Sequence, residues 1–285
     1  MSAVAATFVL TRLGDALGIA VDGLDLNSTL DGTTRDALRR ALLDHLVLCI
    51  RGQSLPPAAY LEAMRAFGTP RPQTRVASQH PEIGEIMILS SEDRDEMGDG
   101  DRVVVGAHWH SDDSYRAVPC SLTMLYALAV PPIGGDTQFT NMYAAYEDLP
   151  EAMKRRIAGL RVVHKYDSSR KSTRIMTLKP GDAAQLPDVT HPLVRTHPET
   201  GRKALYLNPN RMERVAGMER AQSDALLDEL TAHAIAPRYQ YRHQWRAGDI
   251  LIWDNRCTMH KANGDYPSSA RRLMHRIIVA GTVPA

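Results

Sequence analysis

Side chains that bind metals lie close together in the segment His108-Trp109-His110-Ser111-Asp112. If this segment is extended, residues two apart share a face, so His110 and Asp112 point the same way. An imidazole nitrogen together with a carboxylate oxygen suits Fe(II), and a third ligand has to come from elsewhere in the chain. His108 shares the same face, so the spacing leaves His108 with His110 as a competing pair.

A second segment, residues 248–260, reads as an apolar strand, a polar turn and then His260. Arg271, Arg272 and Arg276 follow at the start of another apolar strand. Arginines in such a strand are costly unless they are paired with an anion. The pattern therefore predicts an anion site, and a salt bridge to a protein carboxylate is the alternative interpretation.

A tight turn, Pro131-Pro132-Ile133-Gly134-Gly135-Asp136, delivers Thr137 to the start of a strand. We expect the hydroxyl of Thr137 to be able to bind a ligand carboxylate.

The pattern of apolar residues indicates the elements that must position these groups. Many short strands with period-two alternation, together with a few peripheral helices, favour a mainly β fold such as a sandwich or jelly roll. Asp31 or Thr33 is expected to cap the first helix. The predicted helices span 33–48, 57–67, 143–160 with a break near Pro150, and 218–235; the predicted strands span 121–128, 136–141, 161–164, 192–196, 203–207, 238–245, 249–253 and 271–280.

Two stretches, about 90–102 and 165–188, are predicted to be loops. Long loops inside a compact domain are often lids over a site, so we interpret both as lid-like. A solvated surface insertion is the alternative.

Composition excludes several classes of function. The chain has 285 residues, 44% of them hydrophobic and 24% charged, with a formal net charge of +1. Such a balance gives no field to hold nucleic acid or an anionic membrane, and no apolar run approaches the roughly 20 residues of a membrane span. The N-terminus lacks a secretory signal, and the three scattered cysteines fit a reducing compartment, so we expect a cytoplasmic protein.

Taken together and in this order, the motifs resemble the taurine dioxygenase/2,4-dichlorophenoxyacetate dioxygenase family of Fe(II)- and 2-oxoglutarate-dependent oxygenases. The resemblance implies a double-stranded β-helix, or jelly roll, as a single domain over residues 1–285, and often a homodimer or homotetramer. The motifs that carry it are Gly23-Leu24-Asp25-Leu26, Arg51-Gly52-Gln53, Trp109-His110-Ser111-Asp112, Gly134-Gly135-Asp136-Thr137, His191-Pro192-Leu193-Val194, Arg195-Thr196-His197-Pro198, Gly201-Arg202-Lys203, Trp253-Asp254-Asn255-Arg256, His260 and Arg271-Arg272.

The family pattern places the first metal-binding histidine directly after a tryptophan. This selects His110 with Asp112, leaves out His108, and makes His260 the distal histidine of a catalytic facial triad on iron. In the family, 2-oxoglutarate fills two of the remaining positions on the metal and dioxygen fills the last.

The resemblance also implies partners for the far carboxylate of 2-oxoglutarate. They are Thr137 and Arg272, since a guanidinium grips a carboxylate by two parallel hydrogen bonds. The segment between His260 and the arginine pair is one residue longer than in taurine dioxygenase, so Arg271 remains a second candidate.

The implied reaction is hydroxylation of a substrate C–H bond with release of succinate and carbon dioxide. Arg276 corresponds to the arginine that holds the anionic group of the substrate, and Gln73 and Tyr115 are further candidates for the substrate pocket. Gln73 and Val76 replace the histidine and tyrosine that contact the sulfonate in taurine dioxygenase, and Gly106 replaces an asparagine. A cationic rim of other arginines is possible from the sequence; its candidates are Arg71, Arg75 and Arg102.

We therefore expect a small organic anion as substrate, of the aryloxyalkanoate, alkyl sulfate or sulfonate type, with C–X cleavage after hydroxylation. Two other hypotheses compete. The same triad can bind Zn²⁺ and activate water in a hydrolase, and a jelly roll can also be a binding module without turnover.

Overall fold

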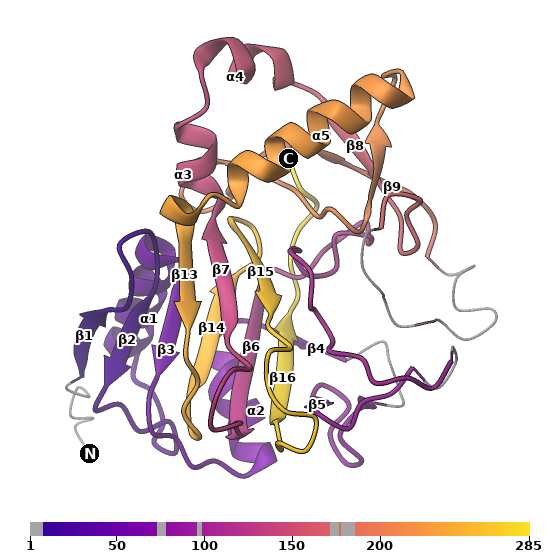
Figure 1. The fold of residues 1–285 in the computed structure, drawn as a ribbon. Helices are drawn as coiled ribbons and strands as arrows, with labels where there is room; N and C mark the ends of the chain where they lie inside the picture. The colour runs from indigo at the N-terminus through magenta and orange to yellow at the C-terminus, as the bar shows by residue number, and fades with distance from the viewer. Residues whose placement is uncertain (1–7, 73–77, 96–98, 172–176, 178–185) are drawn as a thin grey trace.

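A large, mostly antiparallel sheet forms one layer of the molecule (Figure 1). The computed structural model describes residues 8–72, 78–95, 99–171, 177 and 186–285. The order of strands in this sheet is β1-β2-β3-β14-β6-β16-β4, and β5 pairs with β16 beside this path. Its strands are β1 (Val9–Arg12), β2 (Ile19–Asp22), β3 (Val47–Ile50), β4 (Pro70–Arg71), β5 (Met87–Ser90), β6 (Leu122–Ala129), β14 (Ile250–Asp254) and β16 (Leu273–Val279).

A smaller antiparallel sheet faces it, with the order β13-β7-β15. In Figure 1 these three strands lie in front of β14, β6 and β16. Apolar side chains of both layers meet in one buried cluster, which includes Phe139, Leu251 and Met259. Two facing sheets around a shared core make a jelly roll, so the predicted fold class is confirmed. The strands of the smaller sheet are β7 (Thr137–Asn141), β13 (Gln240–His243) and β15 (Thr258–Ala262).

Helices cover the outer face of the large sheet and one end of the sandwich. The helices α1 and α2 pack on the outer face of the large sheet through a second apolar cluster, which includes Leu38, Tyr60 and Ile252. The helix α5 lies across the other end of the molecule, above β13, β7 and β15 in Figure 1, and buries Leu226, Leu227 and Leu230. The helices are α1 (Gly32–His45), α2 (Pro57–Met64), α3 (Met142–Glu147), α4 (Glu151–Ile157) and α5 (Arg220–Ala234), with short 3₁₀ helices at Arg65–Phe67 and Pro237–Tyr239.

Two small sheets complete the end of the molecule near α5. Their strands are β8 (Arg161–His164), β9 (Val189–Pro192), β10 (Val194–Thr196), β11 (Lys203–Leu205) and β12 (Met212–Val215), in the orders β12-β8-β9 and β10-β11.

The first predicted helix was too long. It ends at His45, since Leu46 adopts a left-handed conformation with φ of 65°. The next residues form β3, which pairs with both β2 and β14 and is completely buried. The apolar run Val47–Ile50 at the end of the predicted helix is therefore a central strand. Pairing with distant strands outweighs the local helical pattern.

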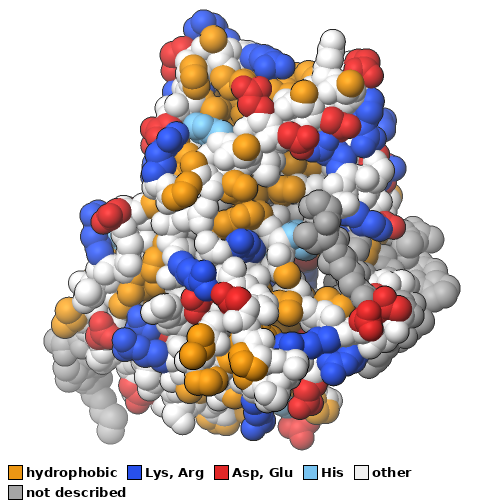
Figure 2. Space-filling model, viewed as in Figure 1, with side chains coloured by type: hydrophobic (Ala, Val, Ile, Leu, Met, Phe, Trp, Pro, Cys, Tyr) orange, Lys and Arg blue, Asp and Glu red, His pale blue; other side chains and the backbone are white. Residues whose placement is uncertain are grey.

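The two lid-like loops lie partly outside the described residues, which lack 96–98, 172–176 and 178–185. Their covering of the site and the single-domain organisation both stay predictions. Positive and negative side chains intermix on the face drawn in Figure 2. Over the described part of the chain, every helix is too short or too polar to cross a membrane.

Asp31 caps α1, because its Oδ1 accepts the backbone N–H of Thr34 at 2.7 Å. Asp31→Ala is expected to lower the free energy of unfolding by about 1 kcal/mol, which is typical for loss of an N-cap. Thr33→Ala is the matched control, because Thr33 is exposed inside the helix. Urea denaturation followed by circular dichroism measures both. Equal midpoints for the two variants would contradict the role of Asp31.

Candidate functional site

The side chains of His110, Asp112 and His260 converge at one point between the two layers. Nε2 of His110 lies 3.6 Å from Oδ1 of Asp112, and Nε2 of His260 lies 3.6 Å from Oδ2. The three ligand atoms all lie within 4.8 Å of one another. Two imidazole nitrogens and one carboxylate oxygen at such spacing are a donor set that fits a divalent metal such as iron(II).

Backbone pairing brings these distant residues together. His110 and His260 form an isolated antiparallel bridge in which each backbone N–H donates to the other residue's carbonyl, at 3.0 and 2.8 Å. His260 itself belongs to β15, where it is paired with Phe139 of β7. The bridge thus fixes residue 110 against an already ordered sheet, and the two rings lie 4.1 Å apart.

Hydrogen bonding separates His110 from its competitor His108. Nδ1 of His110 lies 2.7 Å from the carbonyl oxygen of His108, which can only accept, so Nδ1 carries the proton. In the neutral ring Nε2 is then the nitrogen without a proton, and it is turned toward Asp112, as metal binding requires. The ring of His108 lies beside that of His110, with the ring centroids 4.8 Å apart and the planes tilted by 40°, and it does not belong to the converging group.

Burial and neighbouring side chains act differently on the other two donors. Burial holds the pKa of His260 well below its ordinary value, so this imidazole stays neutral. Burial alone would raise the pKa of Asp112, but the positive charge of Arg276, together with the interactions of the two histidines, outweighs burial and holds this pKa well below its usual range.

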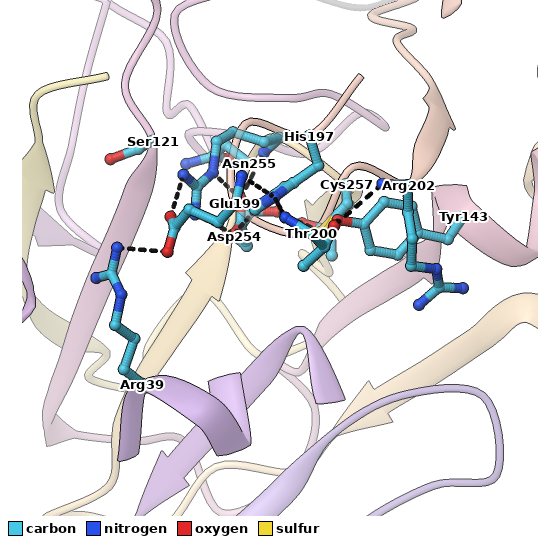
Figure 3. Close-up of polar contacts among 12 residues, drawn as sticks. Arg39, Ser121, Tyr143, His197, Glu199, Thr200, Arg202, Asp254, Asn255 and Cys257 are labelled. Carbon is cyan, nitrogen blue, oxygen red and sulfur yellow. Dashed lines mark hydrogen bonds and ion pairs between the residues drawn. The ribbon is translucent and has the colours of Figure 1, made fainter. Parts of the chain in front are cut away.

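Two further groups of potential ligands occur among the described residues, and in both groups the histidine nitrogens are already engaged in hydrogen bonds within the protein. In the first, Nε2 of His197 donates to Asp254 at 3.0 Å, and its Nδ1 accepts the backbone N–H groups of Glu199 and Thr200 at 3.2 Å each. Asp254 also pairs with Arg256 at 2.6 Å. Figure 3 shows this network, in which Glu199 in turn faces Arg39 of α1. It is a structural anchor for the turn between β14 and β15.

The second group contains Cys49, His243 and Asp249. Nε2 of His243 bonds Asp249 at 3.2 Å, and its Nδ1 bonds the hydroxyl of Tyr241 at 2.8 Å. Arg51 pairs with the same carboxylate at 2.6 Å. Neither of these groups lines the pocket described next.

A pocket opens at the converging group. His110, Asp112 and His260 line it together with Thr137, Arg272 and Arg276, all six of them predicted site residues. The other lining residues are Leu89, Val105, Gly106, Leu125, Trp253 and Ala262. None of them was predicted as a site residue, because apolar side chains carry no chemical signal, although Gly106 and Trp253 were noted in the sequence for other reasons.

Arg272 is a buried cation that forms no ion pair with a carboxylate in the described part of the chain. Its exposed fraction is 8%, and its guanidinium donates a long hydrogen bond from Nε to the carbonyl oxygen of Gly135 at 3.4 Å. Burial lowers the pKa of Arg272, which reflects the cost of an unpaired charge. That cost falls when an anion enters the pocket. Arg271, the other candidate, is exposed to solvent.

Thr137 is ready to donate into the same pocket. Its Oγ1 accepts the indole N–H of Trp245 at 3.0 Å, so its own proton remains for another acceptor. Thr137 stands at the start of β7 after the predicted tight turn, in which Gly134 and Gly135 both have positive φ. A side chain on Gly134 would lie 2.3 Å from the backbone oxygen of Asp265, so only glycine fits.

Arg276 faces the pocket four residues after Arg272 on β16. Its Nη2 lies 2.9 Å from Oδ1 of Asp112. The alternative predicted for arginines of this strand, a salt bridge to a protein carboxylate, therefore holds for Arg276 but not for Arg272 within the described residues.

The remaining candidates for the substrate pocket lie elsewhere. Tyr115 is not among the lining residues described; its hydroxyl donates to Asp113 at 3.1 Å and its ring packs against Tyr166 at 5.1 Å. Gln73, Arg75 and Val76 lie outside the described residues.

Arg71 and Arg102, the other two members of the predicted rim, both have protein partners. Arg71 pairs with Asp113, whereas Arg102 donates to the carbonyl of Ser91 at 3.1 Å and stacks on Tyr266 at 4.9 Å. Gly106 has a φ of 78°, and a Cβ there would lie 3.1 Å from Cε1 of His110. A side chain at Gly106 would therefore press on His110.

Comparison with known proteins identifies the family. A model described as "Taurine catabolism dioxygenase TauD, TfdA family" matches residues 10–278. The chain belongs to this family. It is 36% identical over 287 residues to pentalenolactone F synthase of Streptomyces arenae, covering 95% of each chain. It is 34% identical over 271 residues to the alpha-ketoglutarate-dependent 2,4-dichlorophenoxyacetate dioxygenase of Burkholderia sp. (strain RASC), covering 92% of this chain and 90% of the relative.

A solved structure of AAD-2 in complex with Mn(II) and N-oxalylglycine superimposes with a TM-score of 0.82 at 30% identity, covering 98% of this chain and 99% of that one. Membership of the TauD/TfdA family confirms the family, the fold and the reaction class predicted from the sequence. The enzyme is a dioxygenase that depends on iron(II), 2-oxoglutarate and dioxygen.

Three histidine variants test the geometry of the converging group. His110→Ala and His260→Ala are expected to abolish Mn(II) binding, because each removes one donor, whereas His108→Ala is expected to retain it. Equilibrium dialysis followed by metal analysis measures the bound Mn(II), and thermal melting checks the fold. Equal loss in all three variants would mean that the wrong face of the segment has been chosen.

Proposed function

We propose that His110, Asp112 and His260 bind the iron(II) of this dioxygenase, and that Thr137 and Arg272 bind the far carboxylate of 2-oxoglutarate. The observation that carries the proposal is the buried, unpaired guanidinium of Arg272 in the same pocket as the three metal donors. A dicarboxylic acid can reach both, with one end at the metal donors and the other at Arg272. A zinc hydrolase would leave Arg272 and Thr137 without a role.

When bound, iron(II) would activate dioxygen as the oxidant for hydroxylation of a substrate C–H bond, with 2-oxoglutarate and the substrate each giving up two electrons to it. The chain's own residues orient the reactants and exclude water. Arg272 and Thr137 hold the distal carboxylate of 2-oxoglutarate through charge-assisted hydrogen bonds. Holding this end positions the opposite end of the molecule near Asp112. The apolar side chains of Leu89, Val105 and Leu125 line the pocket and keep bulk water from the reacting C–H bond.

The substrate class proposed is a small organic anion. Arg276 supports it, because this guanidinium lines the pocket, is mostly shielded from solvent and lies beside Asp112, so it presents a positive charge near the three metal donors. The name of the Burkholderia relative points the same way, to an aryloxyalkanoate, and alkyl sulfates and sulfonates carry a similar anionic end. Hydroxylation of a carbon that bears an ether or sulfate oxygen gives a product that collapses with C–X cleavage.

We further propose that the enzyme works in the cytoplasm as a homodimer or homotetramer of single-domain chains, without nucleic acid or membrane partners. The three cysteines support a reducing compartment, since all are buried and free. A formal net charge of +1 supports the absence of polyanionic partners.

Substitution of Arg272, with the neighbouring Arg271 as the matched control, tests the proposed 2-oxoglutarate site. Arg272→Leu is expected to raise the KM for 2-oxoglutarate about 10- to 100-fold, since a hydrogen bond to a charged group contributes about 1.5–3 kcal/mol. Arg271→Leu is expected to leave this KM unchanged, because Arg271 is exposed. Succinate formation at varied 2-oxoglutarate concentration measures both. A larger effect at Arg271 would reverse the assignment.

The proposed function as a whole is tested by anaerobic visible spectroscopy of the enzyme with Fe(II) and 2-oxoglutarate. A metal-to-ligand charge-transfer band is expected, and it should shift when a substrate anion is added. Candidate aryloxyalkanoates, alkyl sulfates and sulfonates are compared with their neutral esters or amides as controls. Bound iron without a band would contradict 2-oxoglutarate chelation. Succinate formation stimulated only by the neutral compounds would contradict an anionic substrate.

A further inference from the structure

Asp112 is held by a closed ring of hydrogen bonds that passes through Asn255 and Thr123. The backbone N–H of Asp112 donates to Oδ1 of Asn255 at 3.2 Å. Nδ2 of Asn255 donates to Oγ1 of Thr123 at 2.8 Å, and this hydroxyl donates to Oδ2 of Asp112 at 2.6 Å. All three residues are buried, and neither Asn255 nor Thr123 is among the residues that line the pocket.

The direction of every bond in this ring is determined by the chemistry of its members. Oδ1 of Asn255 also receives the indole N–H of Trp253 at 3.2 Å. Indole and backbone N–H groups can only donate, so the oxygen of the Asn255 amide must face them and its NH₂ must face Thr123. The hydroxyl of Thr123 therefore accepts from Asn255 and turns its own proton to Asp112.

Sheet register fixes both partners of Asp112. Thr123 of β6 lies directly opposite Trp253 of β14, and Asn255 follows in the turn after β14. Oγ of Ser111 donates to the carbonyl of Asn255 at 2.6 Å, which ties the segment around Asp112 to the same turn. The ring is thus anchored in the large sheet, while Asp112 lies on a segment outside the named strands.

We propose that Asn255 and Thr123 are positioning residues for Asp112, and this inference rests on the proposed function, in which Asp112 binds iron(II). The ring keeps Oδ2 as a hydrogen-bond acceptor and holds the carboxylate in one orientation. Arg276 faces the other oxygen at 2.9 Å, so rotating the carboxylate would disturb contacts at both oxygens. Residues that orient a metal ligand in this way commonly change metal affinity about 10- to 100-fold when mutated.

Thr123→Val tests the ring directly, because valine keeps the branched shape and removes the hydroxyl. We expect about 10-fold weaker Mn(II) binding, measured by isothermal titration calorimetry without 2-oxoglutarate. Thr123→Ser restores the hydroxyl and is expected to restore the affinity. The matched control is Thr140→Val, since Thr140 is equally buried and its hydroxyl donates to the carbonyl of Ala234 at 2.6 Å, outside the ring.

Asn255→Asp tests the direction of the bonds. It preserves size and the accepting oxygen but removes the NH₂ group, so the hydroxyl of Thr123 can turn away from Asp112. An added negative charge near a cation site would by itself strengthen Mn(II) binding, so weaker binding identifies the loss of the donated proton. In the double variant with Thr123→Val the two effects are expected to be non-additive, because both act through the same hydroxyl.

Unchanged Mn(II) affinity in folded Thr123→Val, or an equal loss in Thr140→Val, would overturn the positioning role. If Thr123→Val melts below the assay temperature, the comparison of Asn255→Asp with Thr123→Ser decides the question, and unchanged affinity in Asn255→Asp overturns the inference. Failure of the proposed function looks different, since the unmodified enzyme would then not bind Mn(II), or His110→Ala would bind it as well as the unmodified enzyme does.

Discussion

The single antiparallel bridge between His110 and His260 is the constraint on which the rest of the site depends. Residues directly opposite each other in such a pair project their side chains to the same face, and here the ring centroids are 4.1 Å apart. A slip of one residue would turn the whole segment over and replace His110 by a neighbour on the wrong face. Since His260 is already paired with Phe139 inside the small sheet, the bridge transfers the order of the jelly roll to a segment that belongs to no named strand.

Electrostatics divides the pocket into two ends of different character. At one end Asp112 lies among two histidines and Arg276, so its charge is compensated within the protein. At the other end Arg272 is buried with a lowered pKa and no carboxylate partner among the described residues. A buried charge without a partner is costly to folding, and a protein keeps it where a ligand supplies the opposite charge. This asymmetry gives the pocket a direction, from the proposed metal donors to the proposed anion site at Arg272.

The sequence predicted the site better than it predicted the elements that carry it. His110, Asp112, His260, Thr137 and Arg272 have side chains whose types and spacing signal chemistry, and the structure brings them to one pocket. The strand β15 and the end of α1 were not predicted, because strand pairing is decided by distant partners. The sequence did not mark Thr123 as a site residue, since a threonine in a buried strand is common. Only its pairing opposite Trp253 in the folded sheet brings its hydroxyl to Asp112.

The turn between β14 and β15 connects the pocket to the buried network around His197. It carries Asn255, which contacts Asp112, and it follows Asp254, which contacts His197. The pair of Asp254 with Arg256 is buried, and removal of either partner would leave an uncompensated charge. The outer contact of Arg39 with Glu199 is more exposed and contributes little to stability, because exposed ion pairs gain little in water. The shape of the turn therefore depends on its buried contacts, and through Asn255 so does the orientation of Asp112.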